Sequence, residues 1–153
     1  MKRKIQPQTM DIYDALERRT KRGINCIQVG VIQSFDTNSQ LATVEIAMKQ
    51  VTNVDDKGVK TIKDYPLLVE CPCVTIQGGG DFISFPISKG DNCLVLFNDR
   101  DIDYWLNNGA GGVPTTTRMH DISDGFALVG LNPLTQSIVG YLANGIRLSH
   151  GRS

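Results

Sequence analysis

Two cysteines on either side of a proline form the sharpest metal-binding candidate in the chain. Cys71 and Cys73 occupy an extended stretch, in which alternate side chains point to the same face. A structural zinc site needs two further ligands, and those on offer are irregularly spaced: Cys26, Cys93, His120 and His150. The pattern therefore favours reduced thiols buried in a strand, and it predicts neither a metal ion nor another cofactor.

Three alternating aspartates form a second candidate. Asp99, Asp101 and Asp103 reproduce the opening of a calcium-binding loop. Such a loop also needs glycine at its sixth position and glutamate at its twelfth, where this chain has Tyr104 and Ala110. The calcium interpretation fails at both positions. Acidic side chains gathered at the first turn of a helix, where the helix dipole stabilises them, are the simpler explanation.

The segment "RMHDISDGFALVG" contains the residue types of an acid–base pair. His120 is followed by Asp121 and Asp124, but no serine or cysteine stands near it in a recognisable nucleophile motif. Aspartates in such a segment more often accept hydrogen bonds from backbone N–H groups of a turn. We therefore expect a turn here, and we expect the protein not to be an enzyme.

Three consecutive glycines raise the question of phosphate binding. A glycine-rich loop binds phosphate when it opens a helix, because converging N–H groups then face the anion. Residues 78–80 are instead followed by an apolar, strand-like run. They predict a hairpin turn.

Charge is distributed unevenly along a chain whose 16 basic and 16 acidic residues cancel. Residues 1–22 contain seven basic and three acidic side chains, so the remainder carries an excess of acid. A basic N-terminal segment joined to an acidic remainder is typical of docking to a neighbouring protein. It argues against a nucleic-acid groove along the remainder, which needs many cations to neutralise phosphates.

The elements that would position these residues begin with a helix over residues 9–23. Thr9 can cap its start and Gly23 its end. Its apolar stripe is narrow, which predicts a surface or partner contact rather than a core helix. The side chains expected to dock are Ile12, Leu16, Arg18 and Arg19.

From residue 24 onward the apolar pattern has a period of two, which is typical of strands. Five strands are expected in close succession, over residues 24–35, 40–51, 65–77, 81–87 and 92–98. Within the first, Ile27, Val29 and Val31 share a face and Gly30 lies at a bulge. Within the second, Ala42, Val44, Ile46 and Met48 are expected on one face, with Thr43 and Glu45 on the other.

The connecting segments complete the expected fold. Residues 52–60 read as a polar loop, residues 101–109 as a short helix, and the later runs "FALVG" and "SIVGYLANGIRLSHGRS" as further short strands. The count predicts an all-β fold, either a small five-stranded barrel or a sandwich. One domain at residues 24–133 lies between an N-terminal docking helix at 1–23 and a C-terminal connector at 134–153.

The order of irregular motifs between residues 78 and 133 resembles the N-terminal domain of the membrane-puncturing central spike of contractile-tailed bacteriophages. That family has a glycine-rich turn, an aromatic strand with F-P, a K-G-D turn, a D-R-D-I-D run, a tryptophan, and a later R-x-H-D-x-S-D segment. The matching residues here include Phe85, Pro86, Gly90, Asp91, Asp99, Asp101, Trp105, Arg118, His120, Asp121 and Asp124.

This resemblance implies an oligonucleotide/oligosaccharide-binding (OB) barrel, a homotrimer, and a place in the tail baseplate of the virion after synthesis in the host cytoplasm. The implied partners are the baseplate hub, the tail-tube proteins, a separate spike-tip protein and, transiently, the host envelope. Central spikes continue into a β-helical shaft, which the alternating Ile146 and Leu148 would begin. These two residues are therefore expected at a subunit interface.

Two other functions compete with this one. A single-stranded nucleic-acid-binding OB module would need stacked aromatics in a basic groove, which the acidic remainder of the chain disfavours. A spike with cell-wall hydrolase activity would need a catalytic carboxylate pair, and none is visible in the sequence. The sequence favours a structural virion protein that binds no nucleic acid.

Overall fold

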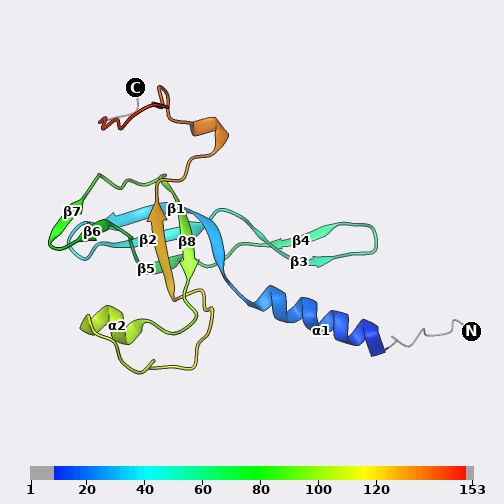
Figure 1. Ribbon diagram of the computed structural model, residues 1–153. Coiled ribbons are helices and arrows are strands. Elements are labelled where there is room, and N and C mark those ends of the chain that lie inside the picture. Colours follow the sequence, from blue (N-terminus) through cyan, green and yellow to red (C-terminus); the bar gives the residue numbers. More distant parts are fainter. Residues whose placement is uncertain (1–8, 151–153) are drawn as a thin grey trace, which may run out of the picture.

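The computed structural model describes residues 9–150 of the chain, and its centre is one curled antiparallel sheet (Figure 1). The five strands are β1 (Ile27–Asp36), β2 (Leu41–Ile46), β5 (Leu68–Pro72), β8 (Asn92–Phe97) and β9 (Gly125–Val129). Their order across the sheet is β5-β2-β1-β8-β9. This arrangement confirms the expected mostly β fold built on five strands. The five-stranded sheet is curled into a half-barrel.

The two edges of the half-barrel approach each other where β5 ends. Cys73 forms an isolated parallel bridge with Ala127, and the Val74 N–H donates to the Ala127 carbonyl at 2.8 Å. The Cys71 thiol donates to the Gly125 carbonyl at 3.0 Å. These contacts hold β5 against β9 and curl the sheet around its core.

Alternating residues of the five strands form the core. In β8, Cys93, Val95 and Phe97 are buried while the residues between them are partly exposed. The remaining buried hydrophobic residues lie in the other four strands: Ile32, Ala42, Val44, Ile46, Leu68, Cys71 and Ala127. The shared face expected for Ala42, Val44 and Ile46 of β2 is confirmed and is the inner one, whereas Met48 lies beyond the strand and is exposed.

Ile27, Val29 and Val31 share one face of β1 as expected, and this face is the outer one. Ile27 and Val29 are exposed, and the inward positions are Gly30 and Ile32. A Cβ atom on Gly30 would lie 2.6 Å from Val44 Cγ1 and 2.9 Å from Val95 Cγ2, so glycine is required where three strands pack closely. The bulge lies not at Gly30 but between Ile32 and Ser34, where the register with β2 shifts.

The fifth strand also differs from the expected one. Residues 81–87 do not join the half-barrel, because β7 (Asp81–Ile83) pairs only with β6 (Ile76–Gly78). Strand β9 takes the fifth place. The hairpin turn expected at the three glycines is confirmed, since Gly79 and Gly80 have φ angles of 62° and 93°.

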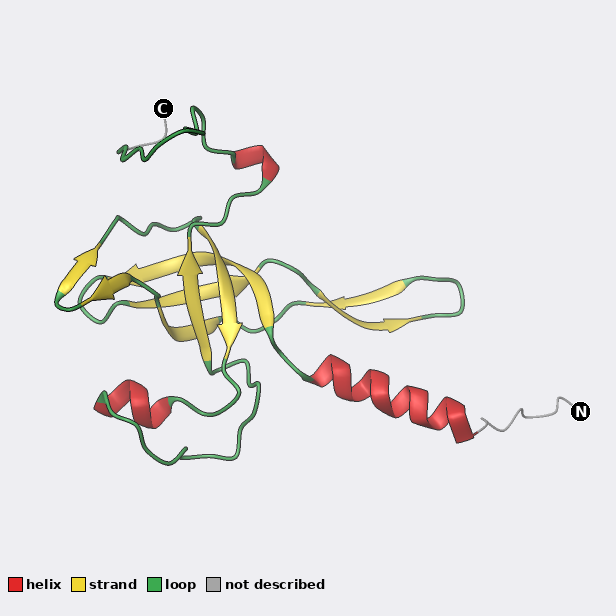
Figure 2. Ribbon diagram, in the orientation of Figure 1, coloured by secondary structure: helices red, strands yellow, loops and turns green. Residues whose placement is uncertain are grey.

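A second hairpin stands where a polar loop was expected. Strands β3 (Gln50–Val54) and β4 (Lys60–Lys63) pair with each other and project from the sheet (Figure 2). The turn between them is closed by Asp55, whose carboxylate accepts hydrogen bonds from the Lys57 and Val59 N–H groups. Every residue of both strands is exposed.

The helix expected at residues 9–23 is present as α1 (Thr9–Gly23), and none of its residues is buried. It stands away from the sheet, on the same side of the view as the β3–β4 hairpin (Figure 1). The short helix α2 (Asp103–Asn108) ends at Gly109, which has the left-handed φ of 67°. No helix among residues 9–150 is long and apolar enough to cross a membrane.

The C-terminal segment corrects the expectation of further strands. Strand β9 corresponds to "FALVG", but residues 130–150 contain only the 3₁₀ helix η1 (Leu134–Gln136) and irregular chain. The expected start of a β-helical shaft is therefore not seen within the described residues. Alternating residues without a neighbouring strand leave their backbone unpaired, so the pattern alone does not create a strand.

The buried thiols yield a testable prediction. Burial raises the pKa of Cys71 to about 12 and that of Cys93 to about 11, whereas Cys26 is exposed. The thiolate is the nucleophile, so iodoacetamide at about pH 8 should modify Cys26 rapidly and the two buried thiols only after unfolding. Intact mass spectrometry would count the labels.

The control for this experiment is Cys26→Ser, which should remove the fast label. The folded chain holds these thiol protons more tightly than the unfolded chain does, because burial raises the thiol pKa. The free energy of unfolding should therefore fall as the pH rises above the unfolded pKa near 9. Rapid modification of Cys71 or Cys93 in the folded chain would show that the half-barrel opens easily.

Candidate functional site

Among residues 9–150, the densest group of charged side chains lies at the end of the half-barrel where β9 begins. The Arg118 Nε and Nη2 atoms donate to the two oxygens of Asp124 at 3.1 and 2.9 Å. Nη2 also donates to Asp103 at 2.9 Å and lies 3.2 Å from an oxygen of Asp101. One guanidinium thus contacts three carboxylates, a set that we call the Arg118 cluster.

Asp101 is held by more than the arginine. Its Oδ2 atom accepts hydrogen bonds from the Thr115 hydroxyl, the Thr116 hydroxyl and the Thr116 N–H, each at 2.7 Å. Its Oδ1 atom accepts from the Asp103 N–H at 2.8 Å. These bonds favour the charged form, so the pKa of Asp101 lies below its usual range, chiefly through Thr115.

Asp124 is the most deeply buried member, with none of its surface exposed. A buried carboxylate is costly unless it is paired and hydrogen-bonded, and here Arg118 supplies the pair while the Ile102 N–H donates at 3.3 Å. The pKa of Arg118 is in turn raised above its usual value. Asp124 makes the largest contribution and Asp103 the next largest.

The arrangement resembles a cation site, but it already contains its cation. Oxygens of Asp101, Asp103 and Asp124 lie within 4.8 Å of one another, which would suit a metal ion. The Arg118 Nη2 atom contacts all three carboxylates. The cluster therefore acts as a cross-link that joins α2, the loop before Arg118 and the start of β9.

His120 is part of a neighbouring contact rather than an acid–base pair with Asp121 or Asp124. Its Nε2 atom lies 3.1 Å from Asp99, and the Asn25 side chain donates to the His120 carbonyl at 2.9 Å. Asp121 accepts hydrogen bonds from the N–H, at 2.9 Å, and from the hydroxyl of Ser123. The turn expected there is confirmed, and the partner of His120 is Asp99.

The other motif residues also take structural positions. Gly90 has a φ of 96°, and its N–H donates to the Ile32 carbonyl, so the K-G-D turn is tied to β1. The Asp91 carboxylate accepts from the Ser88 N–H at 2.8 Å. Trp105 packs edge-on against Phe126 with ring centroids 5.7 Å apart. Phe85 and Pro86 lie outside any strand and are exposed, which corrects the expected aromatic strand.

The expected docking residues lie far from this cluster. Ile12, Leu16, Arg18 and Arg19 are exposed on α1, while Ile146 and Leu148 are 93% and 92% exposed near the other end of the chain. Figure 1 shows the two groups on different sides of the half-barrel. The structure does not bring them together within one copy.

Cys71 and Cys73 remain thiols without a metal-like set around them. Cys71 is buried, Cys73 is half-buried, and burial raises the pKa of both. Among residues 9–150, the three aspartates of the Arg118 cluster are the only grouping of three acidic, thiol or imidazole ligands close enough for an ion.

Sequence reasoning missed the role of Arg118 as the centre of this cluster, together with Thr115 and Thr116. The available signal was a charge imbalance. Four aspartates lie between residues 99 and 121, and the polar loop within this stretch supplies one arginine, Arg118. A buried carboxylate needs a cation, and this arginine was the candidate.

Comparison with known proteins identifies a family for the half-barrel. Residues 29–130 match the family model described as the phage protein Gp138 N-terminal domain. The match spans about two thirds of the chain and runs from β1 through β9, so it includes the whole Arg118 cluster. No curated protein matches the chain.

The Arg118 cluster predicts a large effect of one substitution. Arg118→Ala leaves the buried carboxylates of Asp101 and Asp124 without their cation, and breaking such a pair costs about 3–5 kcal/mol. The free energy of unfolding from urea denaturation should fall by about that amount.

The matched control is Arg100→Ala. Arg100 pairs with Asp99 at 3.4 Å on the surface, where such pairs contribute about 0–1 kcal/mol. If Arg118→Ala is as mild as this control, the cluster does not hold the end of the half-barrel together.

Proposed function

The chain belongs to the phage protein Gp138 N-terminal domain family, and from this premise we propose that it is the barrel portion of a baseplate central spike. Family membership supports a structural role in the phage particle. The finer assignment places the protein at the tip of a contractile tail tube, where it plugs the tube until the sheath contracts.

One observation carries this assignment. The motif positions that resemble central spikes are coupled in space, because Arg118 contacts Asp101 and Asp124, and His120 contacts Asp99. Residues that match the family pattern at irregular spacing in the sequence thus contact one another in the fold. This supports a shared architecture rather than a chance match of turn-rich sequence.

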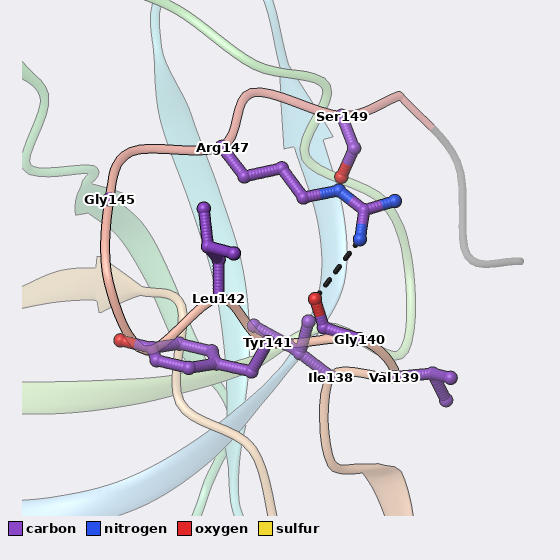
Figure 3. A pocket seen from close by; sticks show the side chains of 8 residues that line it. All are labelled: Ile138, Val139, Gly140, Tyr141, Leu142, Gly145, Arg147 and Ser149. Carbon is purple, nitrogen blue, oxygen red and sulfur yellow. Dashed lines mark hydrogen bonds between the residues drawn. The ribbon is translucent and has the colours of Figure 1, made fainter.

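The exposed C-terminal segment supports a homotrimer. Leu134, Ile146 and Leu148 are 97%, 93% and 92% exposed, and their burial by a partner would be favourable. The segment folds loosely on itself around a hollow of about 210 Å³, where Arg147 donates to the Gly140 carbonyl at 3.0 Å (Figure 3). Copies about a threefold axis could bury these side chains.

The proposed mechanism is mechanical and not enzymatic. A stiff trimer, driven by sheath contraction, transmits force into the host envelope. The Arg118 cluster contributes stiffness because it cross-links three segments through charge-assisted bonds. The proposed partners are the baseplate hub, the tail-tube proteins and a separate spike-tip protein that carries the penetrating point.

The distribution of aromatics disfavours the rival nucleic-acid function. A single-stranded nucleic-acid site stacks successive bases on neighbouring aromatics in a basic groove. The exposed aromatics lie instead on α1, the β6–β7 region, α2 and the C-terminal segment: Tyr13, Phe82, Phe85, Tyr104, Trp105 and Tyr141. We therefore propose that the protein binds no nucleic acid.

Helix α1 is proposed as the element that docks on the hub. None of its residues is buried, and Ile12 and Leu16 are 53% and 62% exposed. Deleting residues 1–22 should therefore leave the half-barrel folded but abolish incorporation into phage tails. Circular dichroism and thermal melting would check the fold, and immunoblotting of purified particles would check incorporation.

A point control sharpens this test. Ile12→Asp with Leu16→Asp places charges on the apolar stripe and should block incorporation, whereas Asp14→Asn on the opposite face should not. Normal incorporation of the truncated chain would contradict the docking role, and loss of folding would show that α1 belongs to the core.

The C-terminal segment yields a separate prediction. The purified chain should sediment as a trimer, and Ile146→Asp should weaken it, because the substitution puts an unpaired charge into an apolar interface. Asn144→Asp, a polar position in the same segment, is the matched control. A monomer at all concentrations in analytical ultracentrifugation would contradict the trimer.

A further inference from the structure

The β3–β4 hairpin has one apolar face and one polar face, although all of its residues are exposed. Val51 pairs with Ile62 and Val54 with Lys60, and paired residues in antiparallel strands share a face. The intervening pair of Asn53 and Thr61 lies on the opposite face, as does the pair of Gln50 and Lys63. The apolar face holds Val51, Val54 and Ile62, which are 46%, 53% and 58% exposed.

The β6–β7 hairpin presents a second uncovered apolar face. Ile76 pairs with Ile83, and the two are 69% and 56% exposed. Asp81 pairs with Gly78 two residues further toward the turn, so its side chain lies on the same face as the isoleucines. This face is apolar near the base of the hairpin and ends in one negative charge.

The two hairpins project from opposite sides of the half-barrel (Figure 1). Within one copy, the apolar face of one hairpin therefore cannot cover that of the other. A protein in water rarely leaves two such faces uncovered, which indicates that a partner buries them. Because the two faces differ, a pairing between them is head-to-tail and not self-complementary.

Charge complementarity identifies the partner as a second copy of this chain. Lys60 is the charged residue on the apolar face of the β3–β4 hairpin, and Asp81 is the charged residue on that of the β6–β7 hairpin. Neither side chain forms an ion pair among the described residues. Each face thus carries one end of a salt bridge that the other face can complete.

We propose that the β3–β4 hairpin of one copy packs its apolar face on the β6–β7 hairpin of the next copy, with Lys60 pairing with Asp81. The contact is heterologous, so it closes into a ring when each copy uses both hairpins. This contact specifies how the copies in the proposed trimer would associate. It rests on the proposed function only for the number of copies, which is three.

A charge-swap experiment tests this contact in the full 153-residue chain. Lys60→Asp and Asp81→Lys each place like charges opposite one another, and each should raise the dissociation constant of the oligomer roughly tenfold. The double variant restores opposite charges and should return the constant to that of the unmodified chain. Lys63→Asp, on the polar face of the same hairpin, is the matched control and should change little.

Disulfide trapping tests which faces meet. In a Cys26→Ser background, a chain carrying both Ile62→Cys and Ile83→Cys should form covalently linked oligomers on mild oxidation. Chains carrying only one of the two new cysteines should remain unlinked when oxidised alone and should form covalent dimers when mixed. Self-linking of either single variant would mean a self-complementary interface and would overturn the proposal.

The outcomes separate this inference from the trimer itself. A trimer whose dissociation constant is unchanged by Lys60→Asp and Asp81→Lys would overturn the hairpin contact while leaving the trimer in place. A chain that is monomeric at every concentration would overturn both. Loss of association in the single variants without rescue in the double variant would also reject the Lys60–Asp81 pair, and circular dichroism would confirm that each variant is folded.

Discussion

The buried carboxylate of Asp124 is the constraint on which the end of the half-barrel depends. Its side chain has no exposed surface, so its charge must be matched inside the protein. Arg118 supplies that charge, and the carbonyl of Asp124 accepts hydrogen bonds from the Asn98 N–H and side-chain amide at 2.8 and 3.0 Å. The pairing fixes where β9 begins. Strand β9 in turn provides the carbonyls of Gly125 and Ala127 that hold the opposite edge of the sheet.

The parts of the fold that sequence predicted well are those decided by local physics. Helix α1 runs over residues 9–23 as expected, with Asp11 in its first turn and Lys21 and Arg22 in its last turn, where these charges interact favourably with the helix dipole. The turns at Gly79 and Gly90 adopt positive φ angles, which glycine tolerates. The alternation in β2 and β8 was also readable, since one face of each strand is buried.

The sequence was insufficient where tertiary packing decides between two local possibilities. In β1 both alternating faces carry apolar residues, and only the close approach of Val44 and Val95 to Gly30 selects the inward face. The strands of the β3–β4 hairpin contain more polar than apolar residues, so the segment read as a loop. The Arg118 cluster joins residues up to 23 positions apart, and no spacing rule reveals such a group. The three aspartates were noticed, but their shared partner was not.

The distribution of apolar surface argues that this fold is built for assembly. Among residues 9–150, ten hydrophobic residues are buried, all within the five-stranded sheet. Large hydrophobic side chains are exposed on α1, on both hairpins and on the segment after Pro133. Each of these elements extends from the half-barrel, and their exposed faces contribute no stability to a single copy. Association that buries them would couple the order of these elements to assembly, because whatever binds only the folded state stabilises it. The half-barrel, cross-linked by Arg118, can keep its shape while the projecting elements supply the contacts. A rigid centre with exposed apolar extensions suits the structural role proposed for this domain in the phage particle.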